Sequence, residues 1–363
     1  MKLTAPVKLL PDAQQAGALR RTMEQANAAC QFVSDRAWDT KFFRRYDLQH
    51  LCYRAIRTHF GLSAQVAVRV IAKVADAYKL DRQCKRTFKP TGSIAYDDRI
   101  LSWRLDKSTV SVWTVEGRLH IPFVCGDRQR TLLQDRQGET DLVTFRGFFF
   151  LSATCEVQEP DPIDVEGVLG VDLGVTNLAV DSDGEIHSSS QINSMRHRHR
   201  RLRAKLQRKG TRSARRRLKA LSGKEKRFAK DVNHVVSKQI VAKAKDTKRA
   251  IALEDLRGIR LRITVHRRQR ATLHSWSFFQ FRLFVSYKAQ RAGVPVVLVD
   301  PKNTSRTCPR CGTVDKRNRP TQNQFSCVQC GYAGLADHIV ARNIAHRAVV
   351  YLPNVSDTAE LLL

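Results

Sequence analysis

Near the middle of the chain, residues 168–177 read VLGVDLGVTN, and residues 178–184 continue with LAVDSDG. Both runs are apolar with glycines between them, which predicts two strands joined by a tight turn. Further on, the apolar runs 250–253 and 294–299 predict strands, whereas residues 232–244 and 278–292 predict helices. Strands that alternate with helices predict an α/β fold for this half of the chain.

Three acidic residues lie where these predicted elements begin or end. Asp172 ends the first strand, Glu254 follows the run 250–253, and Asp337 precedes a helical stretch at 339–349. An unpaired buried charge costs several kcal/mol, so each carboxylate needs a basic partner or a divalent cation. Three converging carboxylates would form a hard-oxygen site suited to Mg²⁺. Two such ions about 4 Å apart would support phosphodiester hydrolysis.

Each of these acids also has a purely structural interpretation. Asp172 could be a turn residue, Glu254 could pair with Arg257, and Asp337 could cap the helix that follows it. Other acids compete by their position in the sequence, namely Asp181, Asp255 and Asp300. Structural ion pairs place acids in the same way, so the spacing alone leaves both interpretations open.

The composition favours a polyanionic partner. The 363 residues include 64 Lys and Arg against 34 Asp and Glu, which gives a net charge of +30. A compact protein of this charge repels itself unless a polyanion lies against it. A nucleic-acid binder is therefore the first interpretation, and a membrane-surface protein the second. A hydrophobic fraction of 42% allows a sizeable core and excludes a chain that is disordered throughout.

The membrane interpretation has little support from the sequence. The longest apolar runs, such as 294–299 and 148–151, are far shorter than the ~18 residues that span a bilayer. The N-terminal residues MKLTAPVK lack the apolar stretch and cleavage site of a secretory signal. Nine cysteines, five of them scattered singly, do not resemble a disulfide framework. We therefore expect a cytoplasmic protein with no membrane partner.

Four cysteines form two C-x-x-C knuckles, Cys308 with Cys311 and Cys327 with Cys330, and fifteen residues separate the knuckles. This spacing is typical of a zinc ribbon, in which four thiolates surround Zn²⁺ and leave no open position. The glycine after each second cysteine permits the tight turn that the knuckle needs. Because such a site is closed, it predicts a structural zinc rather than a catalytic one, and redox chemistry at the knuckles is the weaker alternative.

The first part of the chain has a different pattern of predicted secondary structure from the second. A strand is predicted at 3–10. One helix is predicted to begin at 11–12 and a second helix to cover 63–79. Each helix carries an apolar stripe that core packing explains. Between about 94 and 157, short alternating runs predict a small antiparallel barrel or sandwich.

A strongly basic segment covers residues 196–230. It holds 17 Lys or Arg and a single acid, Glu225. Apolar residues recur at helical spacing, which predicts a helical hairpin broken near Gly210 or Gly223. A solvated charged surface is the alternative to a nucleic-acid contact here.

Together these motifs resemble the OrfB/TnpB proteins of bacterial insertion sequences, which are relatives of the compact type V CRISPR effectors. The motifs that carry the resemblance are LPDAQQ at 10–15, GVDLG at 170–174, ALEDL at 252–256, NTSRTC at 303–308, and ADH at 336–338 leading to ARNI at 341–344. One departure concerns Ile339, where many members of the family have Asn.

The resemblance implies an α/β nuclease with a split RuvC-like, RNase H-type fold, an N-terminal helical recognition module, a β-barrel wedge module and an inserted zinc ribbon. The wedge module would comprise 1–10 and 91–160, and the recognition module 11–90. The nuclease domain would comprise 164–300 and 337–350, with the basic helical segment at 196–230. Residues 301–336 would form the ribbon, and 351–363 a tail.

The activity implied by the resemblance is RNA-guided cleavage of double-stranded DNA beside a short adjacent motif, with guide RNA and target DNA as partners. Asp172, Glu254 and Asp337 match the nuclease acids, which would hold two Mg²⁺ ions. The four knuckle cysteines match the Zn²⁺ ligands of the ribbon. The sequence leaves any protein partner unknown.

Base pairing with a guide reads the target sequence, so the protein needs contacts to nucleic-acid backbones. The basic segment suits that task through phosphate contacts from Arg200, Arg203, Arg212 and Arg216. The N-terminal modules would hold the guide and read the adjacent duplex in its major groove. Candidates for this readout are Tyr53, Ser63, Gln65 and Arg69.

Three other functions compete with this interpretation. The first is a nuclease-inactive, RNA-guided DNA-binding regulator, which the intact set of three acids disfavours. The second is a DNA transposase, since RNase H-type acids also catalyse strand transfer. The third is a CRISPR effector proper, which would differ mainly in the source of its guide.

Overall fold

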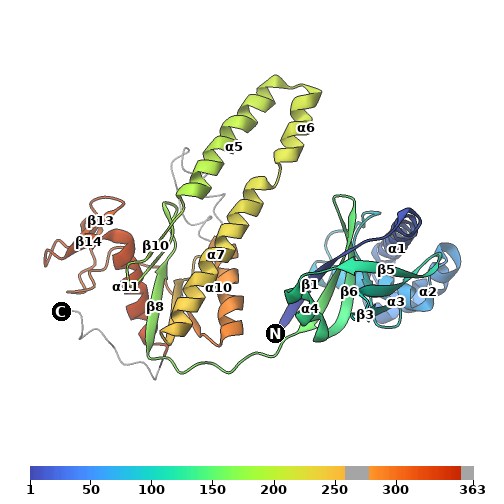
Figure 1. The fold of residues 1–363 in the computed structure, drawn as a ribbon, viewed down its shortest axis with the longest axis horizontal. Coiled ribbons are helices and arrows are strands. Elements are labelled where there is room, and N and C mark those ends of the chain that lie inside the picture. Colours follow the sequence, from blue (N-terminus) through green and yellow to red (C-terminus); the bar gives the residue numbers. More distant parts are fainter. Residues whose placement is uncertain (258–277, 353–363) are drawn as a thin grey trace. The chain divides into compact units, whose positions relative to one another are not determined.

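The computed structural model describes residues 1–257 and 278–352 of the chain. It consists of two compact units, Met1–Gln158 and Glu159–Leu363, which are described separately (Figure 1). Of the sequence predictions, most of the tail at 351–363 lies outside the described residues.

The first unit begins with three helices, α1 (Ala13–Thr40), α2 (Arg45–Phe60) and α3 (Ala64–Leu80). Asp12 caps α1 because its Oδ1 accepts a hydrogen bond from the backbone N–H of Gln15 at 2.8 Å. The Gln15 side chain accepts the N–H of Asp12 in return, which completes a capping box. The predicted helices at 11–12 onward and at 63–79 are confirmed, and α2 is an element that the sequence analysis did not predict.

The same unit contains one antiparallel sheet of seven strands, in the order β2-β6-β7-β1-β5-β4-β3. The sheet is nearly closed and barrel-like, so the barrel is confirmed over the sandwich. A short helix, α4 (Asp127–Gln134), lies between β5 and β6. The strands are β1 (Lys2–Leu9), β2 (Ile94–Tyr96), β3 (Leu101–Arg104), β4 (Thr109–Thr114), β5 (Gly117–Val124), β6 (Arg136–Phe145) and β7 (Phe148–Glu156).

The second unit is built on a mixed sheet of five strands, in the order β10-β9-β8-β11-β12. Strands β8, β9 and β10 pair antiparallel, whereas β8, β11 and β12 run parallel. This confirms the α/β class predicted for this half of the chain. The strands are β8 (Gly167–Asp172), β9 (Asn177–Asp181), β10 (Ile186–Ser188), β11 (Arg249–Glu254) and β12 (Val296–Val299).

Helices cover both faces of this sheet. One face packs against α7 (Lys224–Asp246) and α10 (Phe278–Ala292), where Leu169 and Leu253 meet Ile240 and Phe281. The other face packs against α11 (Ala336–Val349), where Ala252 lies among apolar residues of that helix. Alternate residues of β8 and β11 therefore enter opposite cores, which explains why both strands read as continuous apolar runs.

The helix α11 approaches β8 most closely at Gly170. A Cβ atom added there would lie 2.0 Å from the backbone oxygen of Ala341 and 2.6 Å from the backbone nitrogen of Ala345. Only a residue without a side chain permits this approach of helix to strand, and the strand is the one that ends in Asp172.

Gly170→Ala should therefore destabilise the second unit strongly. Because the clash is with backbone atoms rather than a movable side chain, we expect a loss of about 3 kcal/mol or more in the free energy of unfolding. Gly167→Ala on the same strand is the matched control, since an added Cβ there meets only the Arg249 side chain at 3.6 Å. Chemical denaturation measures both variants, and equal stability of the two would contradict the packing.

Three helices connect β10 to β11 in the chain, α5 (Ser190–Lys209), α6 (Arg212–Leu221) and α7. Gly210 ends α5 with φ +63° and Gly223 caps α7 with φ +76°, so both predicted breaks are confirmed. Figure 1 shows α5 and α6 extending away from the sheet beside the start of α7.

The segment between β12 and α11 contains a short 3₁₀ helix (Lys316–Asn318) and a hairpin of β13 (Gln324–Ser326) with β14 (Ala333–Leu335). Its small core contains Phe325 and two of the knuckle cysteines. Ile339 of α11 joins that core and is 1% exposed. Ile339, which stands where many OrfB/TnpB proteins have Asn, thus packs the hairpin segment against α11.

Candidate active site and cysteine cluster

The three predicted acids converge at one edge of the five-stranded sheet. Leu253 of β11 pairs with Val171 of β8 in parallel register, so Glu254 and Asp172 end neighbouring strands side by side. Asp337 lies in the first turn of α11, which packs across β8, β9 and β11. The carboxyl ends of parallel strands are the usual ligand-binding edge of an open α/β sheet.

Two of these carboxyl groups, those of Asp172 and Glu254, have raised pKa values. Burial raises the pKa of Asp172 well above its ordinary value, and the negative charges of Glu254 and Asp337 raise it further. Burial is also the main cause of the raised pKa of Glu254. Carboxylates in such surroundings stay ionised only if a cation compensates them.

Among the described residues, the knuckle cysteines are the group whose ligand atoms all lie within 4.8 Å of one another. The three carboxylates are spaced more widely than these thiols. They nevertheless lie close enough for the charges of Glu254 and Asp337 to act on Asp172, and their oxygens are the ligand type that Mg²⁺ prefers.

Polar side chains contact the carboxylates of Asp337 and Glu254, and the sequence analysis did not predict these side chains. Asn177 donates to Oδ2 of Asp337 at 3.0 Å, and Arg319 Nη2 lies 3.3 Å from Oδ1 of the same residue. The hydroxyl of Thr304 donates to Glu254 Oε1. Asn177 and Thr304 lie inside or beside quoted motifs, whereas no local pattern in the sequence distinguishes Arg319.

Thr304 is itself fixed by a buried amide. Asn343 of α11 donates to the backbone oxygens of Thr304 and Thr307, both at 2.8 Å. The segment that reaches Glu254 is thereby tied to the helix that carries Asp337.

The competing acids have other partners in the structure. Asp181 is fully buried and pairs with Lys243, while Asp255 pairs with Arg257 and Arg282. Asp300 accepts the backbone N–H of Lys302 in a local turn.

The structure does not support the structural roles considered for Glu254 and Asp337. Arg257 forms an ion pair with Asp255, the residue that follows Glu254. The residue at the N-cap of α11 is Leu335, so Asp337 does not cap that helix.

The raised pKa of Asp172 predicts a pH-dependent cost in the metal-free protein. A carboxyl group whose pKa is raised by folding favours the folded state below its unfolded value of about 3.9, and this contribution is lost as pH rises through the folded value. Asp172→Asn should therefore raise the melting temperature by a few degrees at neutral pH in the presence of a chelator. Near pH 4 it should have little effect.

Thermal unfolding at both pH values measures this difference, and the exposed Asp164→Asn serves as the control. A lower melting temperature of Asp172→Asn than of wild type at neutral pH would contradict this prediction, because it would show that the ionised Asp172 stabilises the folded protein.

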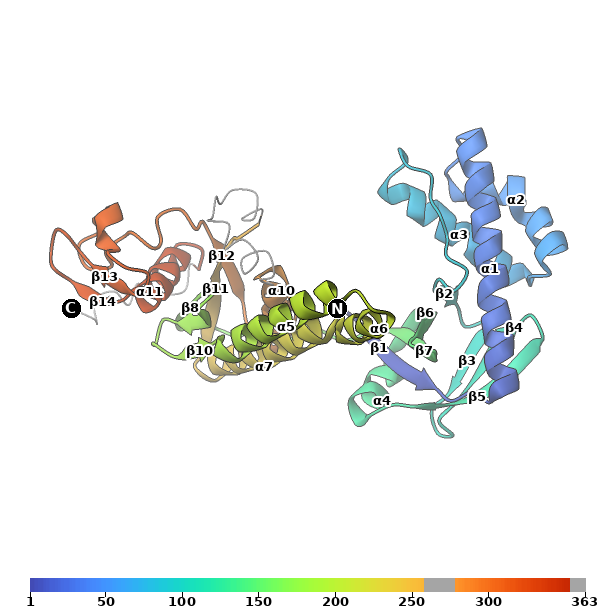
Figure 2. The same cartoon turned by 90° about the horizontal axis from the view of Figure 1, so that it is seen from above.

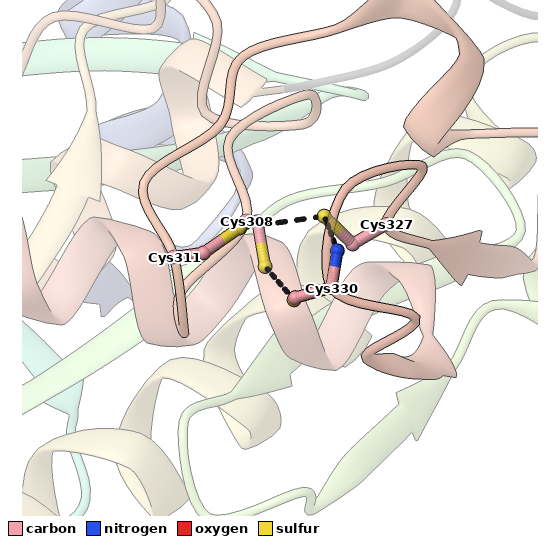
Figure 3. Close-up of side chains that lie close together, drawn as sticks. All are labelled: Cys308, Cys311, Cys327 and Cys330. Atoms are coloured by element: carbon pink, nitrogen blue, oxygen red, sulfur yellow. Dashed lines mark hydrogen bonds between the residues drawn. The ribbon is translucent and has the colours of Figure 1, made fainter.

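The four knuckle thiols face one another (Figure 3). Sγ of Cys308 lies 3.6 Å from Sγ of Cys330, and Sγ of Cys311 lies 3.5 Å from Sγ of Cys327. A Zn–S distance of about 2.3 Å implies S···S edges of about 3.8 Å in a tetrahedron, so the cluster fits Zn²⁺ with little movement.

Backbone turns prepare the cluster. The N–H of Gly312 donates to the oxygen of Cys308, and the N–H of Gly331 donates to that of Cys327, each at 3.0 Å. Both glycines have φ near +70°, a region that favours glycine, which accounts for their position after each second cysteine.

The predicted phosphate-binding arginines differ in their surroundings. Arg200, Arg212 and Arg216 are exposed on α5 and α6. Arg203 is half-buried and donates to Glu225, the only acid of the basic segment, at 3.1 Å. Contact with nucleic acid remains a prediction for all four.

The candidates in the first unit have intramolecular partners. The Ser63 hydroxyl caps α3, Arg69 pairs with Glu139, and Tyr53 accepts from Arg57 at 3.4 Å. Gln65 donates to Asp97 and accepts from Arg99. The structure thus gives each side chain a role within the unit, and readout of a duplex remains a prediction.

Two protein families match separate parts of the chain. Residues 152–257 match the family OrfB_IS605, described as a probable transposase, and residues 278–344 match the Cas12f1-like TNB domain. The chain is similar in sequence to the TnpB and Cas12f proteins. The first match covers β8 to β11 with Asp172 and Glu254, and the second covers β12, the cysteines and Asp337.

Individual TnpB and Cas12f proteins align over parts of the chain. The CRISPR-associated endodeoxyribonuclease Cas12f1 of Sulfoacidibacillus thermotolerans is 36% identical over 139 residues, which are 38% of this chain and 30% of that relative. A TnpB-like protein of Methanocaldococcus jannaschii is 28% identical over 197 residues, which are 51% of this chain and 70% of that relative. The chain thus spans about a third of the length of the first Cas12f1 relatives that it matches.

Solved structures share the fold. A cryo-EM structure of a Cas12f1–sgRNA–target DNA complex has a TM-score of 0.58 at 16% identity, over 90% of this chain and 82% of that one. The mini-RNA-guided endonuclease CRISPR-Cas_phi3 has a TM-score of 0.61 at 11% identity, over 96% and 92%. Within the described residues, none of the helices has the length and apolar character that crossing a membrane requires.

Proposed function

We propose that the chain is an RNA-guided DNA endonuclease that cleaves double-stranded DNA beside a short adjacent motif, using a RuvC-like site. The observation that carries the proposal is the convergence of Asp172, Glu254 and Asp337 at the carboxyl edge of the parallel strands. Recognition, wedge, nuclease and ribbon modules with the boundaries given above are part of this proposal. The names of the Cas12f relatives, which are endodeoxyribonucleases, support it.

The three carboxylates are the residues that would hold Mg²⁺, and two ions are proposed. The burial of Asp172 and Glu254, and the repulsion of Asp172 by the other two carboxylates, make the site favourable for a divalent cation. When bound there, Mg²⁺ would supply an activated water and neutralise charge on the scissile phosphate. Thr304 keeps Glu254 oriented, and Asn177 keeps Asp337 oriented, so the ligands are held before the substrate arrives.

Arg319 places a positive charge against this set. Its guanidinium contacts Asp337 and lowers the pKa of both Asp172 and Glu254. The group can also bind a phosphate oxygen through two parallel N–H donors. We propose that Arg319 positions the scissile phosphate against the carboxylates.

Arg319→Ala should lower the cleavage rate about ten- to a hundredfold, because one charge-assisted contact to the phosphate is lost. Arg319→Lys should retain part of the rate, since the charge remains without the fork geometry. Arg317→Ala is the matched control, because Arg317 is two residues away and pairs with Asp315 on the surface. Equal rates for Arg317→Ala and Arg319→Ala would argue against a role in the site.

The basic helices α5 and α6 would follow the phosphates of the guide–target duplex. Their exposed arginines suit backbone contacts, which carry no sequence information of their own. The cysteine cluster would hold one structural Zn²⁺ and stabilise the segment that carries Arg319.

The test begins with the RNA that co-purifies with the chain. Sequencing that RNA gives the guide, and a plasmid with the matching target and randomised flanks is then incubated with the complex and Mg²⁺. We expect linear plasmid only when the target matches, with one flanking motif enriched. Binding of the matched target without cutting would instead support the regulator, and joined DNA ends would support the transposase.

A further inference from the structure

The outer face of the barrel-like sheet in the first unit carries an unusual set of residues. The β6–β7 hairpin pairs Phe145 with Phe148, and β1 pairs Lys8 with Phe150 on one side and with Val124 on the other. These positions alternate with Phe149 and Leu151, which enter the core. We call Lys8, Val124, Phe145, Arg146, Phe148 and Phe150 the aromatic platform.

The platform exposes large apolar side chains to solvent. Phe145 is 57% exposed, Phe148 is 52% exposed and Val124 is 50% exposed. Phe145 and Phe148 lie on the adjacent strands β6 and β7, and Val124 lies on β5, which β1 with Lys8 separates from β7 (Figure 2). Contiguous exposed apolar patches of this kind mark binding surfaces more often than isolated apolar residues do.

Two cations lie against the exposed rings. Lys8 Nζ is 3.9 Å from the centroid of the Phe148 ring, and Arg146 Cζ is 5.3 Å from that of Phe145. Arg146 and Gly147 form the hairpin turn with φ of +54° and +84°, as in the two-residue turns that match the twist of a hairpin. The rings and cations are therefore displayed on regular β structure rather than on a long loop.

This combination identifies the chemistry of the ligand. Nucleobases stack on exposed aromatic rings, and adjacent cations attract the phosphates that link those bases. A paired base hides both of its faces in the helix, so a platform of rings selects unstacked bases. None of the six platform residues is acidic, and the net charge of the chain is +30. Repulsion between like charges therefore disfavours a second copy of the same chain as the occupant.

We infer that the aromatic platform binds unpaired nucleotides by stacking, with Lys8 and Arg146 on the flanking phosphates. The inference rests on the proposed function, since it assigns this surface to unpaired bases of the guide RNA, which a folded RNA displays in its loops and ends before any target DNA is opened.

The test compares the full chain with its Phe145→Ala/Phe148→Ala variant. Binding is measured without Mg²⁺ to a single-stranded RNA, a single-stranded DNA and a duplex of the same sequence. We expect the variant to lose about tenfold or more in affinity for a single strand, with the duplex affected far less. The RNA strand should lose more affinity than the DNA strand, and a larger loss for the DNA would contradict the assignment to the guide RNA. Lys8→Gln should reduce the salt dependence of the same binding by less than one unit of slope.

Phe42→Ala is the matched control, since Phe42 is a phenylalanine of the same unit that is also 52% exposed. Circular dichroism and melting of each variant check that the unit remains folded, and Phe145→Tyr/Phe148→Tyr should retain binding because its rings still stack. Unchanged single-strand affinity in the folded alanine variant would overturn the inference, and so would a change in oligomeric state instead. A wild-type chain that binds none of the three probes would overturn the proposed function itself.

Discussion

Asp172→Ala is expected to abolish DNA cleavage while RNA-guided binding of the target survives. Asp172 is the member of the acidic set on which both other carboxylates act. Loss of this ligand should slow hydrolysis at least about a thousandfold, which corresponds to about 4 kcal/mol of transition-state stabilisation. Binding should persist because the proposed backbone contacts lie on other elements, above all α5 and α6.

Plasmid cleavage and target binding are measured on the same preparation of this variant. Asp164→Asn, an exposed acid of the same unit, is the control and should cut at the wild-type rate. Loss of binding together with cutting would mean that Asp172 has a structural role instead.

Cys308→Ser should remove bound zinc and unfold the segment between β12 and α11. The core of this segment is small and consists largely of the cysteines, Phe325 and the start of α11, so the ion would supply much of its folding energy. Cleavage should fall as well, since the same segment carries Arg319 and leads directly into Asp337.

Zinc content by metal analysis and thermal melting test this expectation. Wild type should contain one zinc ion per chain, and the variant close to none with a lower melting temperature. Cys84→Ser, at an exposed lone cysteine, should change neither value. Equal zinc content and melting in both variants would argue against a structural metal at the cluster.

The elements around the proposed site could be predicted because their signals are local. Apolar runs bounded by acids and glycines predicted β8 and β11, and the helix predicted at 278–292 coincides with α10. The two cysteine knuckles predicted their own cluster, since spacing along the chain determines most of its geometry.

Other features depend on tertiary contacts that no local pattern contains. Helix α2 buries only Leu48, Cys52 and Ile56 between charged residues, so its apolar stripe is narrow. Arg319 reaches Asp337 only because the hairpin segment folds back onto α11. The platform strands likewise come from distant parts of the sequence, since β1 lies between β7 and β5.

Anomalous X-ray scattering from crystals soaked in Mn²⁺, a substitute for Mg²⁺, would test the central claim most directly. We predict Mn²⁺ peaks coordinated by Asp172, Glu254 and Asp337 in the wild-type protein bound to guide and target, and their loss in Asp172→Asn. Full cleavage activity with Mn²⁺ bound elsewhere, and with no peak at these three carboxylates, would contradict the account.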